Sequence, residues 1–582
     1  MLRRSLGWAC RLGAASGVSG LEALLLTVLC VNVFTLFRFT RWGWFSCDDF
    51  QHAHLAWLTA QGKVIYRDFF DTHGPLFAWM NAAWIRVFGS GRPGFNLILS
   101  MRMLSFVALL GQGGLVFAIG RRLTGRRDLG LLAAALLLSS YLLHDSGTKL
   151  RPDAGQTLLL LAALLAVMDG RPWLAGLGLG LDLCMHLKGL AGAAALVGAT
   201  LLVRAWGGGT LHHARPVRER HNRPGLVFVL KILVSALLVC GVCVAYFAWN
   251  NGLDALVSQV VTHNFSETAD NFSVNEAARA FTRGRFWRWF LRDLPLVLLG
   301  LSGIAVTAGR IFSGRAGANV TLVALAALFS TPVWAFPLYP QVCLPTLPLL
   351  AAAALLPFTA TPSPRGLLVG AAACAAVAGV VRLVEFKTSS ADEARYRREL
   401  EFVLRNSDRK APVLYVWPTV SPAFVFNANH SRLWMLPSDE VGGPRASLTD
   451  VDHWRTREWV VQEKLLQGEV EWLVVDDAEL RVMEARVRDY IVGEYQRVGN
   501  VWRKRRPGTT RAGRDLRERP PARIVRLSER KAGARPSPAP TGAPWRGGVG
   551  STAPVAAPAD VVDPSSCPSA SRTDGSGEAS CL

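Results

Sequence analysis

The stretch GLEALLLTVLCVNVFTLF, residues 20–37, contains one acidic residue and no basic residue. A helix that crosses the hydrocarbon core of a bilayer needs about 20 consecutive, mainly apolar residues. Blocks of similar character recur along the 582-residue chain, of which 51% is apolar. The sequence therefore predicts a polytopic α-helical membrane protein with about eleven transmembrane helices. The other blocks are 103–120, 129–143, 154–168, 172–187, 189–203, 225–248, 293–309, 318–337, 343–358 and 366–383.

The basic residues of the short loops predict the orientation of these helices. The loops 120–128, 204–225 and 309–317 are rich in Arg and lie on the same side as the amino terminus. Cytoplasmic loops carry an excess of Lys and Arg, so this side is expected to be cytoplasmic. Residues 46–76 and everything after residue 384 are then extracytoplasmic. The arginines before residue 20 are interpreted as a topology signal, and we expect the first span to be retained.

The chain after the last apolar block has a different composition. We expect a transmembrane domain at 1–384, with its first outward loop at about 39–102, and an extracytoplasmic α/β or α+β domain at 385–506. In the second domain, 395–406 and 478–493 have helical periodicity, whereas 411–418 and 470–477 are typical of strands.

The net charge of +21 does not indicate a nucleic-acid partner. Residues 503–535 alone contain thirteen Lys or Arg against three acidic residues. Residues 507–582, basic at first and then rich in Pro, Ala and Ser, are too poor in apolar side chains to form a core. We interpret them as a disordered tail that contacts anionic membrane lipids.

The stretch SCDDFQHAHLAWLTAQGKVIYRDFFDTHGPL, residues 46–76, places many ionisable groups directly after the first apolar block. Helical spacing after Asp48 and Asp49 predicts a short helix lying in the membrane interface, with both carboxylates at its start, where the helix dipole favours negative charge. One of them could simply cap this helix. Two in tandem, followed by Asp68, Asp71 and His73, favour a functional site.

This stretch resembles the GT-C superfamily of polyprenyl-phosphate-sugar-dependent glycosyltransferases. The resemblance is strongest to the branch that holds protein O-mannosyltransferases, aminoarabinose lipid A transferases and rhizobial galacturonosyl transferases, and it covers roughly residues 20–385. One departure is Asp49, because relatives commonly have Glu there. The matching motifs are the acidic pair, GKVIYRDFFDTHGPL (62–76), LRPD (150–153), HLKG (186–189) and PLYPQVCLPTLPLL (337–350).

The resemblance implies an integral membrane glycosyltransferase of the inner membrane, with a cytoplasmic amino terminus. Its donor would be a polyprenyl-phosphate-linked sugar, and its acceptor an envelope glycolipid, glycan or protein. The reaction would be inverting, and the tandem acidic motif would supply the base. We assign this role to Asp48, although the sequence does not decide between Asp48 and Asp49. Asp49 would be its partner, a positioning residue or a metal ligand, which the sequence does not decide.

The departing phosphate requires cations. Candidates are Lys149, Arg151, Lys188 and His73, although the three cationic side chains could instead be ordinary residues of the membrane interface. Asp153 would hold a divalent metal ion or orient one of these cations. The use of a metal cofactor is left open, because it varies within the superfamily.

Two other function classes fit the composition. A transporter or flippase of lipid-linked sugars would have charged or broken helices near the midplane of the bilayer. A non-catalytic scaffold of the cell envelope would use only its outward domain. The gathering of ionisable residues on one side of the membrane favours the transferase.

Overall fold

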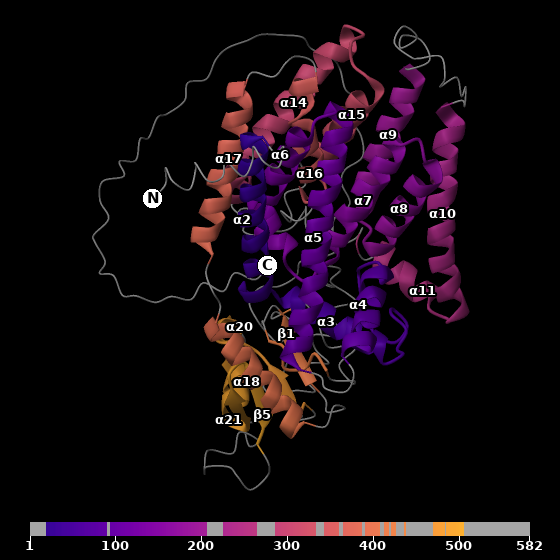
Figure 1. Cartoon of the computed structure of the whole chain (residues 1–582). Helices are drawn as coiled ribbons and strands as arrows, with labels where there is room; N and C mark the ends of the chain where they lie inside the picture. The colour runs from indigo at the N-terminus through magenta and orange to yellow at the C-terminus, as the bar shows by residue number, and fades with distance from the viewer. Residues whose placement is uncertain are drawn as a thin grey trace, which may run out of the picture. The chain divides into compact units, whose positions relative to one another are not determined.

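The computed structural model describes residues 19–89, 94–206, 225–262, 264, 286–332, 343–359, 365–386, 390–407, 413–417, 421–426, 436–437, 470–482 and 485–505. Within them, each apolar block predicted from the sequence contains a helix, and the helices form a bundle (Figure 1). The chain divides into two units after Arg505, and the predicted tail lies outside the described residues. The bundle helices are α2 (Gly20–Trp42), α5 (Phe95–Thr124), α6 (Arg127–Leu138), α7 (Pro152–Met168), α8 (Pro172–Met185), α9 (Gly189–Trp206), α10 (Gly225–Trp249), α14 (Leu294–Phe312), α15 (Ala318–Ser330), α16 (Thr346–Ala353) and α17 (Arg365–Glu385).

The lengths of the bundle helices differ widely. Among the described residues, five helical segments are long and apolar enough to cross a bilayer: α2, α5, α10, α14 and the part Leu368–Glu385 of α17. Helices α7, α8, α9, α15 and α16 are apolar but shorter. At 1.5 Å per residue, α5 is about 45 Å long and exceeds the ~30 Å hydrocarbon core. The predicted class, a polytopic helical membrane protein, is confirmed.

Two short helices follow α2 at one end of the bundle, α3 (Cys47–Ala60) and α4 (Pro75–Phe88) (Figure 1). Ser46 begins α3 with a capping box, because its hydroxyl accepts from the Asp49 amide while Asp49 accepts from the Ser46 amide. This pair satisfies donors that a helix start otherwise leaves open. Gly74 and Pro75 begin α4, where a proline loses no helical hydrogen bond.

The sequence predicted that the helix after Asp48 and Asp49 lies on a surface, in the membrane interface. In the structure, this helix, α3, is instead buried. From Asp49 to Thr59 every side chain is buried. The Phe50 ring stacks on Phe45 with centroids 5.3 Å apart and meets the edge of Tyr396 at 5.2 Å. The apolar side is therefore covered by protein, including residues far away in the sequence, which a helical periodicity cannot reveal.

The region after α17 contains α18 (Ser390–Asn406) and a five-stranded sheet of order β2-β1-β3-β5-β4. Strand β1 is parallel to β2 and β3, whereas β5 is antiparallel to both of its neighbours. The sequence predicted α18, β1, β3 and the helical stretch of α20 and α21, but neither β2 nor the hairpin of β4 and β5. The other bounds are β1 (Val413–Trp417), β2 (Leu436–Pro437), β3 (Trp472–Val474), α20 (Asp477–Val482), α21 (Ala485–Glu494), β4 (Tyr495–Val498) and β5 (Val501–Lys504).

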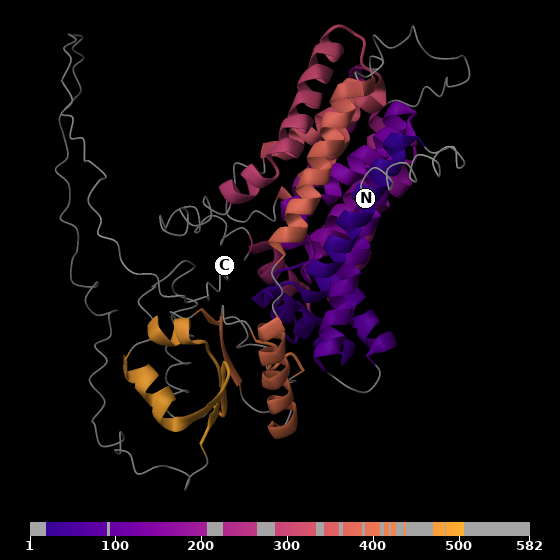
Figure 2. The same ribbon diagram turned by 60° about the vertical axis from the view of Figure 1, so that its left-hand side comes forward.

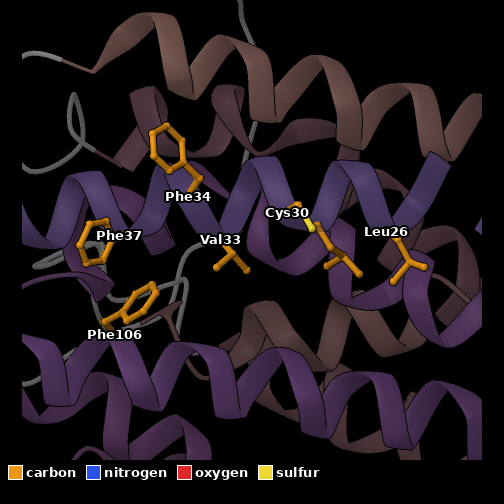
Figure 3. Close-up of a pocket in the computed structure, with 7 residues that line it drawn as sticks. Leu26, Cys30, Val33, Phe34, Phe37 and Phe106 are labelled. Carbon is orange, nitrogen blue, oxygen red and sulfur yellow. The ribbon is translucent and has the colours of Figure 1, made fainter. Parts of the chain in front are cut away.

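The contact of α2 with α5 leaves an apolar groove of about 460 Å³. It is lined by Leu26, Leu29, Cys30, Val33, Phe34 and Phe37 of α2 and by Phe106 of α5, six of which are labelled in Figure 3. No side chain of the groove is ionisable apart from the thiol, so the groove offers hydrocarbon contact and no charge chemistry. The ionisable groups gather elsewhere, near α3 and α4.

The two neighbouring apolar blocks 172–187 and 189–203 form separate helices with a short break between them. Helix α8 ends at Met185, and α9 begins at Gly189, so the residues His186 to Lys188 lie between the two ends. Figure 2 shows the helix bundle of Figure 1 turned by 60° about the vertical axis. The break matters because both ionisable residues of the predicted HLKG motif fall within it.

Candidate functional site

Ionisable side chains from three separate segments meet at the start of α3. Asp48 lies in the first turn of α3, and Arg151 and Asp153 lie at the start of α7. Lys188 comes from the break between α8 and α9. Residues more than a hundred positions apart in the sequence are thus brought together, as the motifs of the resemblance require.

The centre of this cluster is Arg151. Its guanidinium pairs with Asp48 through Nη1 and with Asp153 through Nε, at 2.9 Å from Asp153 Oδ2. Lys188 Nζ lies 4.0 Å from the other oxygen of Asp153. Asp153 is buried, whereas the side chains of Asp48 and Lys188 each keep 27% of their exposure. The cluster is therefore open to a ligand on the side of Asp48 and Lys188.

Three imidazoles border the cluster. The ring of His73 lies 4.6 Å from that of His52 and 4.8 Å from that of His186, centroid to centroid, and both pairs are edge-on. His73 Nδ1 is 2.8 Å from Asp71 Oδ1, and the same oxygen accepts from the His73 amide at 3.1 Å. Asp71 thus fixes the orientation of the His73 ring, because a hydrogen bond at one ring nitrogen leaves the other for a second partner.

The electrostatics of the cluster keep Asp48 ionised and His52 neutral. Burial alone would raise the pKa of Asp48, but Arg151, with smaller contributions from His52, His73 and Lys188, holds this pKa below its ordinary value. Burial, with a further contribution from His73, lowers the pKa of His52 to about 3 against the opposing effects of Asp71 and Asp48. At neutral pH, Asp48 is thus a carboxylate beside the neutral imidazole of His52.

Asp49, the neighbour of Asp48, faces the opposite way. It is fully buried and accepts from the amides of Ser46 at 2.8 Å and Leu150 at 2.7 Å. Its Oδ1 also lies 3.4 Å from Nε of the buried Arg102 of α5. Of the roles that the sequence left open for Asp49, this geometry fits that of a positioning residue, because it ties the start of α3 to residue 150, next to Arg151.

Lys149 is not directed at the cluster in its described contacts. Its ammonium group donates to the Trp44 carbonyl and lies 3.5 Å from the centroid of the Trp44 ring. The side chain is 2% exposed. Of the four residues predicted to bind phosphate, the structure brings together Arg151, Lys188 and His73, and it directs Lys149 to Trp44.

The metal site suggested for Asp153 does not fit its surroundings. Within the described residues, no three His, Cys, Asp or Glu side chains are arranged to hold a metal ion. The two oxygens of Asp153 instead face Arg151 and Lys188. Asp153 therefore corresponds to the other predicted role, the orientation of cations.

Three residues of the cluster were not named as site residues from the sequence. His52 follows Asp48 by one helical turn, so its proximity could have been found from the helical periodicity of 46–60. His186 belongs to the HLKG motif, in which only the lysine was singled out. Asp71 lies two residues before His73 within the quoted stretch, and only the fold reveals that it bonds the imidazole.

Sequence and structure comparisons relate this chain to known proteins. A family model described as dolichyl-phosphate-mannose-protein mannosyltransferase matches residues 72–217. That segment contains His73, Arg151, Asp153 and Lys188. No curated protein sequence matches the chain.

Solved structures share the fold. The oligosaccharyltransferase of Archaeoglobus fulgidus in its apo form matches with a TM-score of 0.50 and 11% identity over 84% of this chain and 75% of that one. ArnT from Cupriavidus metallidurans, bound to undecaprenyl phosphate, matches with a TM-score of 0.48 and 16% identity over 83% of this chain and 96% of that one. The predicted resemblance in sequence is confirmed over residues 72–217, and the likeness to the oligosaccharyltransferase supports the predicted fold.

Proposed function

We propose that this chain is a membrane glycosyltransferase of the GT-C superfamily and that it transfers a sugar from a polyprenyl-phosphate donor to an extracytoplasmic acceptor with inversion. The family model supports the donor class, because it is named for enzymes that use a dolichyl-phosphate sugar. The observation that carries the proposal is the contact between Asp48 and Arg151, in which a potential base and a potential phosphate ligand hold each other.

This contact suggests how substrate binding prepares the site. A guanidinium binds phosphate oxygens bidentately, with stronger hydrogen bonds than neutral donors make. A donor phosphate that draws Arg151 away from Asp48 removes the main charge that lowers the pKa of Asp48. The carboxylate then becomes a stronger base at the moment when the donor is bound.

The chemical step assigns a role to each side chain. Asp48 takes the proton from the acceptor hydroxyl or amine as that group attacks the anomeric carbon. The bond from this carbon to the phosphate oxygen breaks, and its electron pair stays on the phosphate. Arg151, Lys188 and His73 stabilise the charge that develops there. Asp153 holds Arg151 and Lys188 in place, and Asp49 positions the start of α3.

The location of the reaction follows from the loops. The Arg-rich loops at 120–128 and 309–317 support a cytoplasmic amino terminus in an inner membrane. The site, at the other end of α2, would then face the extracytoplasmic side, where lipid-linked sugars replace nucleotide sugars as donors. A glycolipid, a glycan and a protein all remain as acceptor classes, and the C-terminal sheet would guide the acceptor.

The proposal is tested on cells that lack the chain and are supplied with variants. Envelope glycans and glycolipids are compared by mass spectrometry, and we expect one sugar increment to vanish in the deletion strain. The wild type and Asp169→Asn should restore it, since Asp169 pairs with Arg122 at the far end of α7. Asp48→Asn should fail while reaching the membrane in equal amount. Restoration by Asp48→Asn would contradict the proposal and favour a transporter or a scaffold.

A further inference from the structure

Helices α8 and α10 lie side by side in the bundle (Figure 1), and their contact is unusually close. Gly176 and Gly180 face α10 at a spacing of four residues. A Cβ atom on Gly176 would lie 2.2 Å from the Ile232 carbonyl oxygen, and one on Gly180 would lie 2.7 Å from Cβ of Val239. Small residues at this spacing allow the backbones of two helices to approach within a membrane.

The next position of the same face, four residues after Gly180, is Cys184. Its thiol interacts with the thiols of Cys240 and Cys243 on α10, and Cys240 Sγ lies 4.0 Å from the Gly180 carbonyl oxygen. All three cysteines are free thiols. Cys184 and Cys243 are buried, whereas Cys240 is half-buried and thus the most accessible of the three.

This thiol group adjoins the candidate site. Cys184 precedes His186 by two residues, and a Cβ atom on Gly74 would lie 2.2 Å from the Cys184 carbonyl oxygen. Tyr66 belongs to the same buried cluster as Cys184 and Cys243, and it donates to the His73 carbonyl at 2.5 Å. Its backbone is left-handed, with φ of 68°, which is strained for a tyrosine. The thiols therefore border the residues that hold His73 in place.

We propose that Cys184 and Cys240 form a reversible thiol-oxidation site, whose product is a disulfide between α8 and α10. An exogenous disulfide is the oxidant. The sulfur of Cys240 attacks it, loses its proton, and releases one thiol in forming a mixed disulfide. The sulfur of Cys184 then attacks Cys240, loses its proton, and releases the second thiol. Two protein S–H bonds are lost, one S–S bond forms, and the oxidant is reduced to two thiols.

The neighbouring groups determine the order of these steps. Cys240 reacts first because it is the most accessible of the three thiols, and Cys184 completes the bond because its thiol interacts with that of Cys240 across the α8–α10 contact. Cys243 lies on the same face of α10 as Cys240 and stays a thiol after the bond forms, because the single sulfur of Cys184 is then bonded to Cys240. An extracytoplasmic position of this end of the bundle, as proposed above, would expose the site to an oxidising compartment.

The test uses the purified full chain in detergent and the aromatic disulfide 4,4′-dithiodipyridine as the probe, so it does not depend on any transferase activity. Peptide mapping should find Cys184 linked to Cys240, and a phosphine reductant should reverse the link. Cys184→Ala should leave Cys240 as a stable mixed disulfide with the probe. Cys374→Ala, which alters an exposed cysteine of α17, should leave the link unchanged.

Two results would overturn the proposal. One is separate probe adducts on Cys184 and Cys240, or a bond from Cys184 to Cys243 instead. The other is unmodified Cys184 and Cys240 under conditions in which the exposed Cys30 and Cys374 react fully. If Cys184→Ala does not fold, Cys240→Ala at its half-buried position serves instead, and there the probe should form no link from Cys184 to α10.

Discussion

The two ends of the segment between α6 and α7 each contact carboxylates, but in different ways. At one end, Asp293 accepts from the Ser140 hydroxyl at 2.7 Å and from the amides of Tyr141 at 2.6 Å and Leu142 at 3.1 Å. At the other end, Asp48 and Asp153 are both paired with the side chain of Arg151. The first carboxylate is bound mainly by backbone, and the other two by a long and flexible cation.

This difference separates structural from functional carboxylates. A backbone amide cannot leave its partner without unfolding the local chain, so Asp293 and Asp49 stabilise the ends of helices. A guanidinium can rotate toward an incoming phosphate, so the bond between Arg151 and Asp48 can be exchanged without unfolding. The ionisable groups suited to chemistry are therefore those whose partners are side chains.

The largest expected effect tests Asp48 as the base. Asp48→Asn should lower kcat for sugar transfer by about 100- to 10,000-fold, the usual contribution of a positioned base. The thermal unfolding temperature should change little, since the carboxylate is partly exposed and its partner Arg151 keeps Asp153. Transfer assays and thermal unfolding on the same preparations measure both. If Asp48→Asn lowers the unfolding temperature so far that unfolding alone explains the lost activity, the distinction between structural and functional carboxylates is refuted.

Asp49→Asn should give the opposite pattern. The substitution leaves the buried Arg102 without its ionised partner, and breaking a buried ion pair costs about 3–5 kcal/mol. We expect a large fall in the unfolding temperature in detergent, with the activity of the remaining folded fraction reduced far less than in Asp48→Asn. Equal stability of this variant and the wild type would show that Asp49 is not a structural residue.

The two lysines sharpen the same comparison. Lys188→Met should raise KM for the donor by about 10- to 100-fold, because a hydrogen bond to a charged group contributes about 1.5–3 kcal/mol. Lys149→Met should leave KM unchanged and lower stability, since this lysine contacts Trp44. The KM for the donor is measured by donor titration on both variants. A higher KM in Lys149→Met but not in Lys188→Met would assign phosphate binding to Lys149 instead of Lys188.

Asp293→Asn tests the carboxylate that is bound mainly by backbone. An amide has one oxygen for the three donors that the carboxylate now accepts from, so unfolding should become easier by about 1–3 kcal/mol. The donor KM should stay at the wild-type value. A change in KM without a change in unfolding temperature would mean that this end of the segment also takes part in binding.

The smallest expected effect is a pH dependence of stability. Burial lowers the pKa of His54 from 6.5 to about 4, although its hydrogen bond to the Val425 carbonyl opposes this. Between pH 6.5 and about pH 4, His54 is therefore protonated in the unfolded chain but not in the folded chain. The free energy of unfolding consequently falls as the pH drops across this window. Unfolding temperatures measured from pH 7 to pH 4 should decline less steeply in His54→Gln. An identical decline would exclude His54 as the cause.

Much of the fold could be predicted from the sequence because a bilayer imposes simple rules on composition and length. The apolar blocks identified the bundle helices, and Asp48, Arg151, Lys188 and His73 were named before their proximity was known. Which of two adjacent aspartates turns inward depends on distant partners such as Arg102 and the Leu150 amide, and no local pattern contains them.

The hairpin of β4 and β5 was missed for a related reason. Its strands carry Arg497, Arg503 and Lys504, so their alternation is weak, and the turn signal at Gly499, with φ of 62°, was not used. The covering of α3 was missed because its partners, such as Tyr396, come from the region after the last span.

The packing of α3 against the region after α17 determines whether the chain can be divided into separate domains. The rings of Phe50 and Trp57 on α3 pack against Tyr396 and Phe426, and His54 donates to Val425. The helix that supplies Asp48 is thus packed against, and covered by, the region that follows the last span. A chain truncated after α17 would expose this aromatic surface to water, so the two regions are expected to fold as one cooperative unit rather than as independent modules.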